Sequence, residues 1–300
     1  GLGVPAVLMD VWDPGDALRI VDAERISVMI STPVFVRSMI DHPDFASADT
    51  SSIRLLSVGG AGVAPATVRE GAASFGGPHG CWCKRTYGST EYPTLTTGRL
   101  GDDPELQATT DGAIIGPAEL RIVDPTTLTD VADGLPGELW ARGPEMFSGY
   151  LDAELDVSAF AADGWFRTGD LATYSRGYLT IVDRLKDIVI RGGENISAAE
   201  VEHALLSHPA VADCAVVAVP DPVMGERACA FVIPRGETPP TLAELSRHIA
   251  AQGLAPFKRP ERLELRDSLP RTPSGKVQKA PLRDEAARLA AAERATEGSF

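Results

Sequence analysis

The first half of the chain alternates between short apolar runs and segments with helical spacing. Apolar residues recur every three to five positions across residues 14–25, which predicts an amphipathic helix. Pro33 and Pro65 suit the first turn of two further helices, because that turn needs no backbone amide hydrogen. The apolar runs between these segments predict strands at residues 6–9, 28–30 and 53–58. Such an alternation favours a mainly parallel sheet flanked by helices.

From about residue 112 the pattern changes to short strand candidates between turns rich in Gly, Pro and Asp. These candidates lie at residues 114–115, 120–123, 138–141 and 178–182. They predict a β-rich subdomain over residues 112–185. We therefore expect residues 1–185 to form one α/β region that ends in this subdomain.

The last third of the chain again mixes helices and strands. Ser197-Ala-Ala-Glu200 and Thr241-Leu-Ala-Glu244 have the capping-box pattern that begins a helix. Apolar runs predict strands at residues 211–219, 228–233 and 262–265, and an Ala-rich segment predicts a helix over residues 280–295. Residues 186–300 therefore read as a separate small α+β domain.

Charge and composition narrow the function classes. The 300 residues carry a formal net charge of -14, which argues against broad nucleic-acid binding and against a polybasic membrane surface. The sequence has no signal peptide and no apolar run of about 18 residues, so we expect no membrane span. Cys81 and Cys83 are spaced C-x-C, which is not a zinc pattern. We expect a cytoplasmic protein whose four cysteines are reduced.

Glycine-rich and charged segments recur along the chain, and each taken singly suits an ordinary turn. In order they are Ser57-Val-Gly-Gly-Ala61, Tyr87-Gly-Ser-Thr-Glu91, Gly137-Glu-Leu-Trp140, Trp165-Phe-Arg-Thr-Gly-Asp170, Asp183-Arg-Leu-Lys-Asp187, Arg191-Gly-Gly-Glu-Asn195 and Pro273-Ser-Gly-Lys276. Together and in this order they resemble the adenylate-forming superfamily of acyl-CoA synthetases, peptide-synthetase adenylation domains and luciferases. The resemblance covers nearly the whole chain and is greatest to an acyl-CoA synthetase. It implies that residues 1–185 are the C-terminal portion of the family's large α/β domain and that residues 186–300 are its small mobile C-terminal domain.

The resemblance implies a reaction in two steps. A carboxylate attacks the α-phosphate of ATP, which releases pyrophosphate and leaves an acyl-adenylate. A thiol, usually that of CoA, then displaces AMP. The expected ligands are a small carboxylic acid, ATP, Mg²⁺ and CoA, with a carrier protein as the alternative acceptor.

The same resemblance assigns roles at the nucleotide. Glu91 would help to hold Mg²⁺, which prefers oxygen ligands, and Thr90 would offer its hydroxyl to the phosphates. Tyr87 would place its ring against adenine, and Asp170 with Arg184 would bind the ribose. The nucleotide-binding set is thus Gly59, Gly60, Ala61, Tyr87, Gly88, Asp170 and Arg184.

Three further roles fall in the small domain. Lys276 is the expected catalytic lysine, whose point charge offsets negative charge building on the transferring oxygens. Its motif is not a G-x-x-x-x-G-K-[ST] loop, because Pro270 stands for the first Gly and Val277 for the final Ser or Thr. Lys186 would be the hinge for rotation of this domain between the half-reactions. The expected thiol path comprises Gly192, Gly193, Glu194, Phe257 and Arg259.

One family element has no counterpart in the sequence. Relatives carry a Gly/Ser/Thr-rich phosphate loop upstream of the Gly59 segment, and residues 1–56 contain no such run. We therefore expect that the sequence lacks the N-terminal portion typical of the family, and that adenylation by this portion alone is impaired. The alternatives are a ligase that loads a carrier protein and a non-catalytic fragment that acts as a binding module. The acyl pocket would use residues near 57–61 and 86–94, and the acid itself is not identified.

Overall fold

The computed structural model describes residues 3–273 and 275–297, so Ser274 of the Pro273-Lys276 motif lies outside the described residues. The chain divides into two compact units, Gly1–Ile115 and Gly116–Phe300. This division lies near the start of the expected β-rich subdomain. The expected boundary between residues 185 and 186 lies inside the second unit and stays a prediction.

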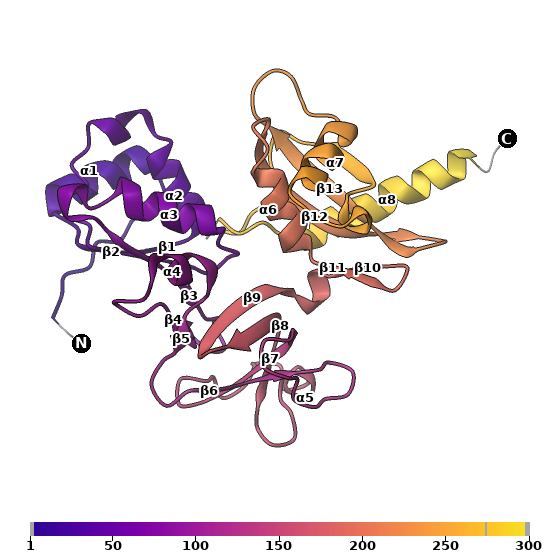
Figure 1. The fold of residues 1–300 in the computed structure, drawn as a ribbon, viewed down its shortest axis with the longest axis horizontal. Coiled ribbons are helices and arrows are strands. Elements are labelled where there is room, and N and C mark those ends of the chain that lie inside the picture. Colours follow the sequence, from indigo (N-terminus) through magenta and orange to yellow (C-terminus); the bar gives the residue numbers. More distant parts are fainter. Residues whose placement is uncertain (1–2, 274, 298–300) are drawn as a thin grey trace. The chain divides into compact units, whose positions relative to one another are not determined.

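The first unit is built on a five-stranded sheet in the order β1-β2-β3-β4-β5 (Figure 1). Strands β1 (Val28–Ser31), β2 (Leu55–Gly59) and β3 (Trp82–Tyr87) are parallel. Two short antiparallel strands, β4 (Thr96–Thr97) and β5 (Ala113–Ile114), continue the sheet. The connections contain α1 (Pro14–Glu24), α2 (Pro33–Ile40), α3 (Pro65–Ser74) and α4 (Pro104–Thr109), with the single-turn helices η1 (Pro43–Ala46) and η2 (Gly77–His79).

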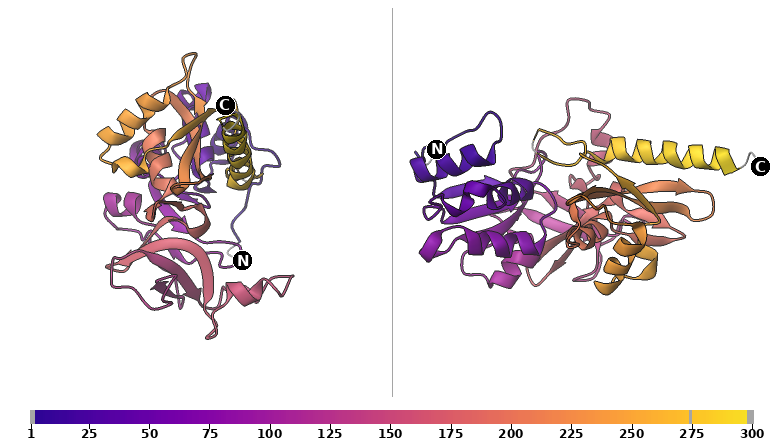
Figure 2. Two further views of the ribbon diagram at one scale, coloured as in Figure 1. Left: turned by 90° about the vertical axis from the view of Figure 1, so that its right-hand side faces the viewer. Right: turned by 90° about the horizontal axis from the view of Figure 1, so that it is seen from above.

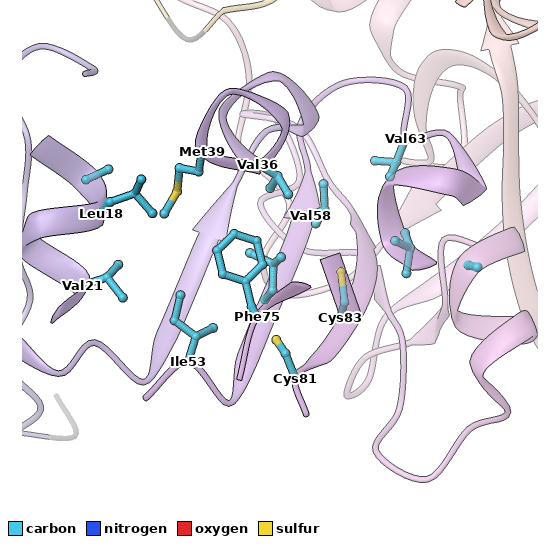
Figure 3. Close-up of a cluster of buried hydrophobic side chains, with 14 residues drawn as sticks. Leu18, Val21, Val36, Met39, Ile53, Val58, Val63, Phe75, Cys81 and Cys83 are labelled. Atoms are coloured by element: carbon cyan, nitrogen blue, oxygen red, sulfur yellow. The ribbon is translucent and has the colours of Figure 1, made fainter. Parts of the chain in front are cut away.

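The predicted helices of this unit are confirmed. Each of α1, α2 and α3 begins with proline in its first turn, and the Asp13 side chain caps α1 by accepting from the Asp16 amide. Their apolar stripes pack on one face of the sheet in a single cluster that includes Leu18, Met39 and Phe75 (Figure 3). Alternate strand residues such as Leu56 and Val58 point to this face and make it apolar, so the helices cover it.

The opposite face of the same sheet has a different character. Ile30 is 82% exposed there, whereas Ser57 and Lys84 are buried. The strand predicted at residues 6–9 is wrong, since the segment has no strand pairing and Leu8 is 90% exposed. An apolar run forms a strand only where a neighbouring backbone accepts and donates its hydrogen bonds.

The second unit begins with a four-stranded antiparallel sheet in the order β6-β7-β8-β9. Its strands are β6 (Glu119–Val123), β7 (Gly137–Arg142), β8 (Phe166–Ser175) and β9 (Tyr178–Arg184), and the short helix α5 (Asp156–Ala159) precedes β8. Sequence patterning predicted β6, β7 and β9 but missed β8. The alternation in β8 is hidden because Thr168, Gly169 and Asp170 interrupt its apolar positions.

The rest of this unit is a second sheet with helices on both faces. The sheet joins β11 (Glu194–Ile196), β10 (Val189–Arg191), β13 (Gly225–Pro234) and β12 (Val211–Asp221) in that order, and β14 (Arg262–Leu265) also pairs with β13. Helices α6 (Ala198–Leu206) and α7 (Leu242–Ala251) pack on one face, and α8 (Lys279–Glu297) packs on the other (Figure 2). The helical turns η3 (Leu185–Asp187) and η4 (Pro256–Lys258) complete it.

The two predicted capping boxes differ. Thr241 and Glu244 form the full reciprocal box at the start of α7. At α6 the Ser197 hydroxyl accepts from the Glu200 amide, but the Glu200 carboxylate binds the Lys258 ammonium at 2.6 Å. The architecture is thus the expected one, mixed α/β sheets followed by a small C-terminal α+β portion.

Candidate functional site

Two of the predicted nucleotide segments lie side by side in the first unit. Because β2 and β3 are parallel, both end at the same edge of the sheet, and Gly59 pairs with Thr86. The segment Gly59–Ala61 leaves the end of β2, and Tyr87–Glu91 leaves the end of β3. The carboxyl edge of a parallel sheet is the usual ligand position in α/β folds.

The backbone is very close-packed at this edge. A methyl group added at Gly59 would lie 2.4 Å from the Thr86 carbonyl oxygen, and one at Gly88 would lie 2.1 Å from the Pro93 carbonyl oxygen. Gly60 has a φ of 76°, which side chains disfavour. Gly59 thus lets the end of β2 approach the end of β3 without a side chain between them, whereas Gly88 allows the loop after β3 to fold back on itself.

The loop after β3 is held by its own backbone. The Ser89 amide donates to the Tyr92 carbonyl at 2.8 Å, and the Leu95 amide donates to the Tyr87 carbonyl at 3.0 Å. This leaves Thr90 exposed and Glu91 half-buried at the edge of the sheet. The turn therefore presents a hydroxyl and a carboxylate from a fixed backbone.

The Thr90 hydroxyl and the Glu91 carboxylate are too few to hold a metal by protein ligands alone, but they suit Mg²⁺, which needs few protein ligands. Across residues 3–273 and 275–297, no cluster of three or more His, Cys, Asp or Glu side chains could hold a metal. Mg²⁺ commonly takes one or two carboxylates and completes its shell with water and substrate phosphates. Glu91 is suited to that single-carboxylate role.

Sequence reasoning missed a buried polar cluster beneath these loops. The Ser57 and Thr86 hydroxyls lie 2.8 Å apart, and the Thr86 and Thr97 hydroxyls also lie 2.8 Å apart. The Lys84 ammonium donates to Thr86 at 3.2 Å and also to Thr97. Lys84 is only 8% exposed, and burial lowers its pKa. Strand β3 was not predicted from the sequence, so the buried face that Lys84 and Thr86 share was missed with it.

In the second unit the structure brings Asp170 and Arg184 together. They pair across β8 and β9, and the Arg184 Nε lies 3.1 Å from an Asp170 carboxylate oxygen. Asp170 is 6% exposed, whereas the Arg184 side chain is about half exposed. A buried acceptor beside an exposed cation is compatible with the predicted ribose contact.

The predicted hinge lies in a segment anchored on both sides. Lys186 is exposed in η3. Before it, Asp183 accepts from the Ser197 hydroxyl at 2.8 Å and from the Ala199 amide at 3.0 Å. After it, the Asp187 carboxylate lies 2.6 Å from the Arg283 guanidinium of α8.

A buried ion pair close to this segment was also missed. The Lys279 ammonium lies 2.8 Å from a Glu202 carboxylate oxygen, and each side chain is 16% exposed. Glu202 also accepts from the Val216 amide at 2.6 Å. Burial lowers the pKa of Lys279, but the charge and hydrogen bond of Glu202, together with the charges of Asp187 and Asp183, raise it overall. The two residues are far apart in sequence, so no local pattern could pair them.

The residues predicted for the thiol path have two kinds of surroundings. Gly192 and Gly193 form the tight turn between β10 and β11, with φ of 56° and 91°, and Glu194 follows in an exposed position. Phe257 packs against the core of α6 and α7, and the Arg259 Nε is buried without a hydrogen-bond partner among the described residues. Their predicted roles stay predictions.

Lys276 lies on an exposed turn of the second unit. Its carbonyl accepts from the Thr272 amide at 2.9 Å, and its amide donates to the Thr272 hydroxyl at 3.2 Å. An isolated bridge between Arg271 and Val277 closes this turn. Its backbone is therefore fixed while the ammonium is accessible. The predicted site residues are divided between the units, with Gly59–Glu91 in the first and Asp170–Lys276 in the second.

The chain is similar to known proteins along most of its length. Residues 1–151 match the AMP-binding enzyme family, and residues 200–276 match the AMP-binding enzyme C-terminal domain. It is 38% identical to 2,3-dihydroxybenzoate-AMP ligase of Bacillus subtilis, over 94% of this chain and 52% of that protein. It is 35% identical to medium-chain fatty-acid–CoA ligase of Escherichia coli, over 95% and 50%.

Solved structures agree with these matches. ATP-bound MatB from Rhodopseudomonas palustris superposes with a TM-score of 0.81 at 31% identity, covering 91% of this chain and 53% of that one. The chain therefore spans about half the length of the relatives it matches. No helix among the described residues is long and apolar enough to cross a membrane. On the family match over its first half and the accompanying C-terminal domain, this chain belongs to the AMP-binding enzyme family.

Proposed function

We propose that the protein containing this chain activates a carboxylic acid with ATP and then transfers the acyl group to CoA. The carboxylate oxygen attacks the α-phosphorus, the bond to pyrophosphate breaks, and an acyl-adenylate forms. The thiolate sulfur then attacks the acyl carbon, and the carbon–oxygen bond to AMP breaks. The products are a thioester, AMP and pyrophosphate.

The observation that carries this proposal is the meeting of two predicted nucleotide segments at one sheet edge. Gly59–Ala61 and Tyr87–Glu91 converge there with no side chain between their backbones at Gly59. Glycine at this position lets the two strand ends pack closely, so that the segments that follow them start side by side. The Asp170 carboxylate would accept hydrogen bonds from the ribose hydroxyls, and Arg184 beside it would supply a donor.

Charge stabilisation is the main task of the remaining residues. Lys276 would place its ammonium against the oxygens that gain negative charge during adenylation. Glu91 would hold Mg²⁺, which supplies charge neutralisation at the phosphates when bound. Thr90 would donate its hydroxyl to a phosphate oxygen. The exposed Lys186 is the proposed hinge.

The acceptor of the acyl group is the open part of the proposal. One relative is named as an AMP ligase and another as a CoA ligase, and both match the chain over almost all of its length. A carrier protein is therefore the second candidate acceptor. Transfer to CoA is favoured here by the residues near the expected thiol path, where the buried Arg259 Nε has no partner among the described residues.

The test uses the complete natural gene product that contains this chain. It is incubated with ATP, Mg²⁺ and a pool of carboxylic acids, with and without CoA, and the products are identified by mass spectrometry. Lys276→Ala should reduce AMP formation by roughly 100- to 1,000-fold. Arg247→Ala, an exposed cation on α7, is the matched control and should leave it unchanged.

Each product pattern has one meaning. AMP together with one acyl-CoA, both lost in Lys276→Ala, supports the ligase. AMP with an acyl-adenylate but no acyl-CoA supports transfer to a carrier protein. Failure of every acid to yield AMP contradicts the proposed activity.

A further inference from the structure

Lys84 is a buried cation whose surroundings differ from those of the other buried cations. The buried Arg85 guanidinium lies 2.8 Å from the Asp111 carboxylate, and the buried Lys279 ammonium lies 2.8 Å from Glu202. Among the residues that the structure describes, Lys84 has no carboxylate within ion-pair distance. A buried charge without an opposite charge is costly, so its retention calls for a reason.

The partners of Lys84 account for only part of its hydrogen-bonding capacity. An ammonium group has three N–H donors. Two of them reach the hydroxyls of Thr86 and Thr97, and the ammonium also lies 5.5 Å from the centre of the Trp82 ring. The described residues thus leave one donor available beside an aromatic surface.

The position of this donor is close to the proposed reaction centre. Thr86 directly precedes Tyr87 and pairs with Gly59 across the two parallel strands. The Ser57 hydroxyl, two residue pairs further from the edge, bonds to Thr86. Lys84 therefore lies near the strand ends that continue into the Gly59 and Tyr87 loops. Its side chain is on the face of the sheet that α1, α2 and α3 do not cover.

We propose that Lys84 is a specificity-determining residue that binds an oxygen acceptor on the acyl group, remote from the carboxylate that is activated. This inference rests on the proposed function and narrows its substrate class. The preferred acids carry a hydroxyl, a ketone or a second carboxylate, and the corresponding hydrocarbon acids are poor substrates. Apolar parts of the acyl group would contact the Trp82 ring.

Elementary energetics gives the direction of this preference. When a hydrocarbon acid binds, the third donor of Lys84 loses water and gains no partner, which is the costly outcome for a buried polar group. When an oxygenated acid binds, the same donor makes a hydrogen bond from a charged group. A charge-assisted bond of this kind corresponds to a preference of about 10- to 150-fold.

The test measures kcat and KM for matched pairs of acids with the complete gene product. One pair is hexanoate and its diacid adipate, and the other is cyclohexanecarboxylate and its ring-keto derivative. The oxygenated member of at least one pair should have a kcat/KM about 10- to 100-fold higher, mainly through KM, because the contact is made in both the ground and transition states. Which pair shows the preference distinguishes an anionic from a neutral acceptor.

Substitution then assigns the preference to its residue. Lys84→Met keeps the length of the side chain and removes its donors, so the preference should fall to within about 3-fold while the hydrocarbon acid is converted at least as well as before. Arg54→Met, an exposed cation just before β2, is the control and should keep the full preference. Thermal unfolding of each variant shows that it is folded.

The outcomes separate this inference from the function on which it rests. If acids are activated but no oxygenated member is preferred, or if Lys84→Met keeps the preference, the assignment of Lys84 is overturned and the ligase activity stands. If no acid in any pair yields AMP, the proposed activity itself fails.

Discussion

Two buried lysines show how differently the two units use the same side chain. Lys84 in the first unit is 8% exposed and has hydroxyl partners, whereas Lys279 in the second is 16% exposed and faces Glu202. Burial lowers the pKa of Lys84, whereas at Lys279 the carboxylates of Glu202, Asp187 and Asp183 together outweigh burial and raise the pKa. Lys279 thus joins α8 to α6 as part of the fold. Lys84 has no such structural partner among the described residues, which is typical of groups that act on a ligand.

The largest effect is expected from breaking the pair in the second unit. Glu202→Gln leaves the Lys279 ammonium buried without its counter-charge and should lower the free energy of unfolding by about 3–5 kcal/mol, measured by chemical denaturation. Glu200→Gln on the same helix is the matched control, because its Lys258 partner forms a more exposed pair and the change should stay within about 1 kcal/mol. Equal losses in the two variants would contradict the structural role of Glu202.

A smaller loss is expected when the hydroxyl partners of Lys84 are disturbed. Thr86→Val keeps the shape of the side chain but removes the oxygen that contacts Ser57, Thr97 and Lys84. The free energy of unfolding should fall by about 1–3 kcal/mol. In a Lys84→Met background the same change should cost less, because the ammonium no longer needs that acceptor. Additive losses would show that Thr86 and Lys84 act independently.

Removing Lys84 itself should alter stability least among these substitutions. The Ser57, Thr86 and Thr97 hydroxyls still bond to one another in Lys84→Met, and methionine fills a similar volume. The free energy of unfolding should therefore change by less than about 1 kcal/mol. Lys279→Met should lose several times as much, because Glu202 then stays buried without its cation. A loss at Lys84 as large as that at Lys279 would identify Lys84 as a structural residue.

The pH dependence gives the smallest and most specific signal. Since the folded pKa of Lys84 is lowered, the unfolded chain binds more protons than the folded one in the range between the two pKa values. Stability contributed by this site therefore rises with pH in that range. For Lys279 the folded pKa is raised, so its contribution is complete below the unfolded pKa and is lost as pH rises through the folded value. Chemical denaturation between neutral pH and about pH 10 checks this. As the pH rises, the free energy of unfolding of the wild type should increase relative to that of Lys84→Met.

Part of the fold could be predicted because its signals are local. Proline in the first turn and apolar spacing predicted α1, α2 and α3, and the reciprocal pattern of Thr241 and Glu244 predicted the start of α7. Strand β8 was missed because its pattern is interrupted by Thr-Gly-Asp, and residues 6–9 were wrongly predicted because their apolar run has no pairing strand. A strand depends on a neighbour that may be remote in sequence, whereas a helix satisfies its own backbone.

The motifs gave the candidate site residues but not their grouping. Sequence order alone placed Gly59 and Tyr87 in separate turns, and the parallel register of β2 and β3 brought those turns to one edge. Asp170 and Arg184 became neighbours through the antiparallel register of β8 and β9. The strand pairings thus bring together motif residues that are separated in the sequence.

By itself, the sequence determined the helices with self-contained caps, the acidic overall charge and the ordered motifs of the AMP-binding enzyme family. Only the tertiary structure decided which polar residues are buried and what they face. Lys84 and Lys279 each stand among ordinary neighbours in the sequence. Burial lowers the pKa of Lys84, which a strand face places among hydroxyls. At Lys279 a helix brings a carboxylate that helps to raise the pKa, because electrostatic interactions depend on distance in space.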